Sequence, residues 1–93
     1  MPAEIVKKIA RAGHRDIYVT VMDDYGAELH RALPVTLTAA ERLAKINSDI
    51  ALMNAGQQQL ETAAAEEGLD LAAAKTAGVA AKAAARKKSG MVG

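Results

Sequence analysis

The sequence predicts an α+β protein with a short N-terminal helix, a β-hairpin, a long amphipathic helix and an alanine-rich C-terminal helix. Residues 16–22 and 27–33 alternate apolar and polar side chains with a period of two, which is typical of paired strands. Residues 38–68 place apolar side chains at steps of three and four, which indicates a helix. Twelve of the 23 residues from 63 to 85 are alanine, which favours a second helix.

Residues 2–12 are expected to form the N-terminal helix. Pro2 suits a first helical turn, because the N–H that it lacks would be unpaired there, and Gly13 suits the residue after the last turn. Glu4 and Lys8 are four residues apart in the order that stabilises a helix.

The two alternating segments predict a hairpin closed at residues 23–26, because the sequence Asp-Asp-Tyr-Gly is typical of a turn. Pro34 lacks an N–H and therefore marks the end of the second strand or a sheet edge. One face of the first strand is expected to carry Ile17, Val19 and Val21.

The long helix begins with a capping box, in which Thr38 and Glu41 are expected to bond each other's backbone N–H. The apolar positions of this helix form a narrow stripe along one side, as in a coiled coil, which we call the seam. A seam of this kind requires a partner helix in this chain or in another copy. We expect the part before Gly56 to pack on the hairpin and the part after it to extend beyond the hairpin. The seam consists of Leu43, Ile46, Ile50, Met53, Gln57, Leu60 and Ala64. The residues expected to contact a partner are Ile50, Met53, Gln57, Leu60 and Ala64.

The chain divides into residues 1–68, the helix–hairpin–helix domain, and residues 69–93, an alanine- and lysine-rich helical extension with a tail. The net charge of +1 hides an asymmetry, since residues 1–70 carry −4 and residues 71–93 carry +5. Gly68 is expected to end the long helix and Asp70 to cap the next one, while residues 89–93 are expected to fray.

No pattern in the sequence indicates an enzyme, a metal site or a cofactor. His14 and His30 have no third ligand at a metal-binding spacing, and we interpret them as surface residues. Asp23 and Asp24 are interpreted as turn residues, because a catalytic pair would need a pocket that raises one pKa. No serine elbow, phosphate loop or dinucleotide motif occurs, so neither an enzyme nor a small-molecule substrate is expected.

Composition predicts a small protein of the cytoplasm, or of a virion if the chain is encoded by a phage. There is no cysteine, no signal-peptide pattern and no apolar run long enough for a membrane span. With no Phe or Trp and only two Tyr, the core has few large side chains. Oligomerisation is a common remedy for so small a core.

The basic C-terminal segment suggests an alternative function. Its cations resemble those of Ala/Lys tails that neutralise nucleic-acid phosphates without reading sequence. One competing interpretation is a solubilising helix end, whose cations complement the helix dipole. Another is docking onto an acidic partner surface, such as the acidic body of a neighbouring copy. The candidate phosphate-binding residues are Lys82, Arg86, Lys87 and Lys88.

The predicted element order resembles that of the small head–tail joining proteins of tailed bacteriophages. The similar stretch covers about residues 2–55: the segments 5–12 and 17–33, then Val-Thr-Leu-Thr at 35–38 leading into Leu-Ala-Lys-Ile at 43–46. The resemblance is one of topology, with no diagnostic motif, and both the long helix and the alanine-rich segment depart from it. It implies a non-enzymatic virion connector present as a ring of copies.

We therefore expect a structural or assembly protein that acts through protein–protein contacts of its long helix, as a homo-oligomer or within a larger assembly. A nucleic-acid-binding accessory protein is one alternative. The other is a small inhibitor or regulator of a host protein, which docks through the hairpin edge or the helix.

Overall fold

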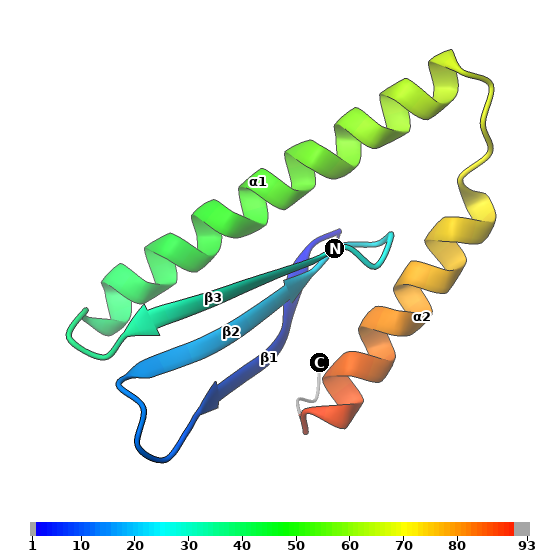
Figure 1. The fold of residues 1–93 in the computed structure, drawn as a ribbon. Helices are drawn as coiled ribbons and strands as arrows, with labels where there is room; N and C mark the ends of the chain where they lie inside the picture. The colour runs from blue at the N-terminus through cyan, green and yellow to red at the C-terminus, as the bar shows by residue number, and fades with distance from the viewer. Residues whose placement is uncertain (1, 91–93) are drawn as a thin grey trace.

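The computed structural model describes residues 2–90 and contains a three-stranded antiparallel sheet followed by two helices (Figure 1). The strands follow one another in the sheet in chain order. The described part of the chain is elongated, with extents of 48 × 24 × 19 Å. The elements are β1 (Glu4–Ala10), β2 (Asp16–Met22), β3 (Glu28–Pro34), α1 (Ala39–Glu66) and α2 (Ala72–Lys88).

The prediction of an N-terminal helix is wrong, because this segment is the edge strand β1. Ile5, Val6 and Ile9 have a high strand propensity, and β1 pairs antiparallel with β2 from Glu4 to Ala10. A bulge between Ile5 and Lys7 shifts the register, and this irregularity hides the strand period in the sequence. The helix-like charge spacing is therefore overridden by pairing with the neighbouring strand.

The predicted hairpin is confirmed as β2 and β3, which pair in register from Asp16↔Pro34 to Met22↔Glu28. The Asp23 carboxylate fixes the turn, since its Oδ1 accepts hydrogen bonds from the backbone N–H of Tyr25 and of Ala27, both at 2.9 Å. This Asp therefore has the structural role that the turn chemistry predicts.

Helix α1 begins and ends as the sequence predicts. Thr38 Oγ1 accepts the Glu41 N–H at 3.1 Å, and the Glu41 carboxylate accepts the Thr38 N–H at 2.8 Å. At the other end Gly68 has φ +70°, Gly68 N–H bonds the Ala65 carbonyl, and Leu69 N–H bonds the Ala64 carbonyl. These two bonds are a Schellman motif, which fixes the turn into α2.

The core lies between α1 and one face of the sheet. Val19, Val21 and Leu33 from the sheet and Ile46 from α1 are each at most 2% exposed. The expectation that Val19 and Val21 share an inward face with Ile17 agrees with this cluster, in which Ile17 is partly buried. The first half of α1 thus completes the core over the hairpin.

Helix α2 runs back along β1, and its last turn lies over the other face of the sheet. The ribbon shows α1 and α2 joined at one end of the molecule and separated by the sheet towards the other (Figure 1). The Ser89 hydroxyl donates to the Val6 carbonyl at 2.6 Å and holds the end of α2 to β1. Of the segment expected to fray, residues 91–93 lie outside the described residues.

Gly78 allows α2 to pack against the turn between β2 and β3. A Cβ at this position would lie 2.0 Å from the Asp24 carbonyl oxygen and 2.6 Å from the Tyr25 carbonyl carbon. Both obstacles are backbone atoms, which cannot rotate away. The position therefore requires glycine despite its low helix propensity.

We predict that Gly78→Ala destabilises the fold by roughly 1–3 kcal/mol, because the overpacking outweighs the gain in helix propensity of up to about 1 kcal/mol. Urea denaturation followed by circular dichroism measures the change. Ala77→Gly is the matched control: it lies next in the same helix and should cost only the propensity difference. Equal stability of Gly78→Ala and the unmodified chain would contradict the close approach.

Candidate functional site

Lys82 forms the centre of a buried polar cluster that joins α2 to the sheet. Its side chain is 5% exposed, and its ammonium lies 2.6 Å from Asp24 Oδ1 and 2.6 Å from the Pro2 carbonyl oxygen. The Glu4 carboxylate lies 3.8 Å from the same nitrogen and also pairs with Arg86, one helical turn further along α2. Two cations of α2 therefore meet two carboxylates of the sheet region.

Gln57 of α1 completes this cluster from the opposite helix. Its Oε1 accepts the Asp24 N–H at 3.1 Å, and its Nε2 lies 3.5 Å from Asp24 Oδ2. Burial opposes ionisation of the Asp24 carboxyl, but the Lys82 ammonium and the Gln57 amide outweigh it and hold the pKa of Asp24 below its ordinary value. Asp24 thus links the sheet to both helices.

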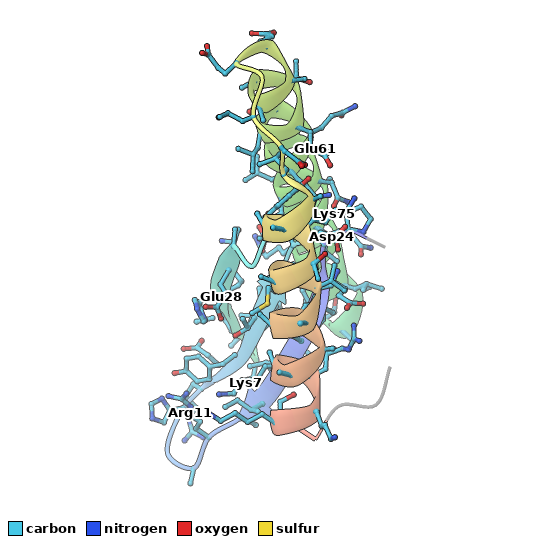
Figure 2. The ribbon with its side chains drawn as sticks, turned by 90° about the vertical axis from the view of Figure 1, so that its right-hand side faces the viewer. Lys7, Arg11, Asp24, Glu28, Glu61 and Lys75 are labelled. Carbon is cyan, nitrogen blue, oxygen red and sulfur yellow. The ribbon has the colours of Figure 1, made fainter. Side chains whose placement is uncertain are left out.

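Two further contacts attach α1 to the hairpin. The Arg31 guanidinium of β3 donates to both Asp49 oxygens, at 2.8 and 2.5 Å, and holds the pKa of Asp49 below its ordinary value despite burial. The Tyr25 hydroxyl donates to the Glu61 carboxylate at 2.7 Å, and this bond raises the pKa of Tyr25 to about 12. Glu61 also lies 3.9 Å from Lys75, which brings the start of α2 towards α1 (Figure 2).

Of the residues expected to contact a partner, four face the chain's own fold. Ile50 and Met53 pack against the core cluster, while Gln57 and Ala64 are buried, at 6% and 5% exposed. Leu60 is 45% exposed. The turn of the hairpin covers Gln57, and Ala64 is buried where the chain leaves α1. Part of the segment of α1 that the sequence leaves uncovered is therefore enclosed by the chain's own fold.

Of the predicted phosphate-binding residues, Lys82 and Arg86 are engaged with Asp24 and Glu4. Lys87 and Lys88 are exposed. The structure therefore brings together two of the four cations in an internal cluster and leaves two at the surface.

A row of exposed apolar residues runs along one side of α1 beyond the core. Leu52 is 66% exposed and Leu60 is 45% exposed, and Gly56 lies midway between them. Because the three are spaced by four residues, they lie one above another on the helix surface. A Cβ added at Gly56 would meet no atom of the described residues within 4 Å, so the fold itself does not require a glycine there.

A groove of about 710 Å³ lies between the end of α2 and the face of the sheet opposite α1. Its apolar lining includes Val6, Ile9, Tyr18 and Ala85. Exposed cations stand around it: Lys7 and Arg11 from the β1 side and Lys88 from α2. Glu28 and His30 line it on the β3 side.

Tyr18 is ordered by its neighbours within this groove. The Arg11 guanidinium lies over its ring, 4.9 Å from the centroid, and His14 Nδ1 lies 2.7 Å from its hydroxyl. His30 Nδ1 lies 3.1 Å from Thr20 Oγ1. Both histidines thus bond neutral hydroxyl groups.

Within residues 2–90, no group of three His, Cys, Asp or Glu side chains could hold a metal ion. None of the described helices has the length and apolar character needed to cross a membrane.

Sequence reasoning missed the groove, the Lys82 cluster and the need for Gly78. The groove could not be found without knowing that residues 4–10 form a strand. The sequence contains a weak signal for the cluster, because Lys82 is a single cation within a run of alanines and stands apart from the basic run at residues 86–88.

Comparisons with protein-family models, with curated proteins and with solved structures each found no match to this chain.

We predict that Lys82→Met destabilises the fold by about 3–5 kcal/mol, because it leaves Asp24 buried without its counter-ion. Lys87→Met is the matched control and should change stability by about 0.5 kcal/mol or less, since Lys87 is exposed. Chemical denaturation at pH 7 measures both. Similar values for the two variants would contradict the structural role of Lys82.

We predict that the protein loses stability in acid. The folded-state pKa values of Asp24 and Asp49 lie below their ordinary values. Their contribution is therefore present above the unfolded pKa of about 3.9 and disappears as pH falls through the lower folded values. Unfolding free energy measured from pH 7 to pH 2 should begin to fall below about pH 5. The Asp49→Asn variant should have a lower unfolding free energy at pH 7, and this free energy should fall less steeply in acid. An unchanged slope of unfolding free energy against pH would contradict the role given to Asp49.

Proposed function

We propose that this protein is a non-enzymatic assembly protein that associates with copies of itself through the exposed side of α1. The observation that carries the proposal is the row formed by Leu52, Gly56 and Leu60. Two large aliphatic side chains flank a glycine that the fold does not need, although glycine costs up to about 1 kcal/mol in a helix interior.

A contact between helices accounts for all three residues of this row. Leucine side chains supply apolar area, and a glycine between them lets a second helix backbone approach closely. The small core of the chain agrees with this function, because oligomerisation stabilises scaffolds of this size.

A role in a phage particle is the narrower form of the proposal. The resemblance to head–tail joining proteins included an N-terminal helix, and strand β1 stands in that place. The proposal therefore rests on the surface of α1, and a location in the cytoplasm or in a virion remains an expectation from the sequence.

No observation favours the alternatives to the same degree. Lys82 and Arg86 are held by internal carboxylates, which weakens the case for a phosphate-binding tail. The β3 edge could receive a host protein, as the regulator alternative requires, but no feature of the edge points to a particular partner.

We predict that Gly56→Ala has opposite effects on folding and assembly. It should raise the monomer's unfolding free energy by up to about 1 kcal/mol, because alanine favours the helix. It should weaken self-association by roughly tenfold, because a methyl group forced into a close contact costs about 1–3 kcal/mol. Sedimentation velocity over a concentration series measures association, and urea denaturation measures stability.

The control for this variant is Thr62→Ala, an exposed position on another side of α1 that also gains helix propensity. It should stabilise the fold without changing assembly. A chain that remains monomeric at all concentrations, or a Gly56→Ala variant that associates as the unmodified chain does, would overturn the proposal.

A further inference from the structure

Charge is divided between the two ends of the molecule. No Lys or Arg occurs between Lys45 and Lys75, and the turn between α1 and α2 carries the acids Glu66, Glu67 and Asp70. The opposite end of α2, together with β1 and the loop after it, carries exposed cations. They are Lys7, Lys8, Arg11, Arg15, Lys87 and Lys88.

The acidic turn also presents an apolar side chain. Leu69 is 64% exposed. In the chain, the exposed Glu67 and Asp70 flank the pair formed by Gly68 and Leu69. The Schellman bonds hold the turn on one side, and Asp70 Oδ1 accepts the Ala72 N–H at 2.9 Å on the other. The turn is therefore fixed in shape before any partner binds, which reduces the entropy lost on binding.

The groove at the other end has the complementary character. Its apolar lining of Ile9, Tyr18 and Ala85 suits a leucine side chain. The lining also includes the cations Lys7, Arg11 and Lys88, which outnumber its one acid, Glu28. Lys7 and Arg11 are near one end of α2, whereas Glu61 is near the other (Figure 2).

A single copy cannot bring these two surfaces together. They lie at opposite ends of α2, a helix of 17 residues, which spans about 25 Å. A turn that enters this groove therefore belongs to another copy. Such a contact joins two different surfaces and repeats from copy to copy, so it builds a ring or a filament.

We propose that the acidic turn of one copy, residues 66–70, docks in the basic groove of the next, with Leu69 among the apolar lining residues. This inference shares with the proposed function the premise that the chain assembles with itself. The docking surfaces are separate from the Leu52–Gly56–Leu60 row. The contact weakens as salt screens the charges.

Site-specific cross-linking tests the docking directly, because the chain contains no cysteine. A Leu69→Cys chain is mixed with an Ile9→Cys chain under mild oxidation, and disulfide-linked dimers are counted on non-reducing gels. We expect several-fold more mixed dimer than with the control partner Val79→Cys, which is 43% exposed on α2 and does not line the groove. High salt should reduce the yield. Equal yields for both partners would overturn the proposal.

Charge reversal gives an independent measurement with a built-in rescue. Glu66→Lys with Glu67→Lys, and separately Lys7→Glu with Arg11→Glu, should each lower the assembled fraction in sedimentation velocity. An equimolar mixture of the two variants should restore it, because each turn then meets a groove of opposite charge. Failure of the mixture to recover would overturn the docking, as would loss of cross-linking when a single-stranded oligonucleotide is present during the oxidation.

The two interfaces are separated by combining the variants. Gly56→Ala in the cysteine chains should leave the Leu69–Ile9 cross-link unchanged. If assembly depends on Gly56 and is indifferent to both charge reversals, the docking fails and the proposed function stands. If the charge reversals act and Gly56→Ala does not, the docking stands and the row on α1 is not an interface.

Discussion

The ion pair between Lys82 and Asp24 is the interaction on which the arrangement of the elements depends. Helix α2 consists largely of alanine, and its one valine, Val79, is 43% exposed, so apolar burial alone gives it little hold on the sheet. The buried ammonium supplies that hold, because leaving either charge without the other would be costly. Asp24 in turn receives Gln57 from α1, so a single turn residue fixes the position of both helices.

This arrangement differs from the usual division between a hydrophobic core and a polar surface. The core under α1 is conventional, with Val19, Val21 and Ile46 in contact across one face of the sheet. The contact with α2 is polar, and it requires both correct charges and the absence of a side chain at Gly78. Removing one member of a buried charge pair leaves the other charge uncompensated, so the placement of α2, which forms the groove, depends on both Lys82 and Asp24.

The sequence predicted those elements whose local pattern agrees with their tertiary role. The hairpin alternates cleanly, and the capping box at Thr38 and the glycine at 68 mark the ends of α1. The strand β1 was predicted as a helix, because Glu4 and Lys8 have helical charge spacing and the bulge after Ile5 breaks the strand period. Pairing with β2 decides the conformation of this segment, and a long-range contact of that kind leaves no mark on local sequence.

The predicted interaction residues illustrate the same limit. Gln57 looked like a polar residue in a seam between chains, and it is buried against Asp24 of its own chain. Helical periodicity identifies a face that needs covering, but it does not identify the covering element. Leu60 belongs to that face and stays exposed, whereas Leu52 lies outside it, so the exposed row becomes visible only after the covered side of α1 is known.

The order of the strands has a consequence for how the molecule folds. Each strand pairs with its neighbour in the chain through a short loop, so the sheet closes with little loss of chain entropy. The contact of Lys82 with Asp24 joins residues 58 positions apart. We therefore expect the sheet and α1 to form first and α2 to dock last. Amide hydrogens of α2 would then exchange with solvent through local detachment of that helix, well before the sheet opens.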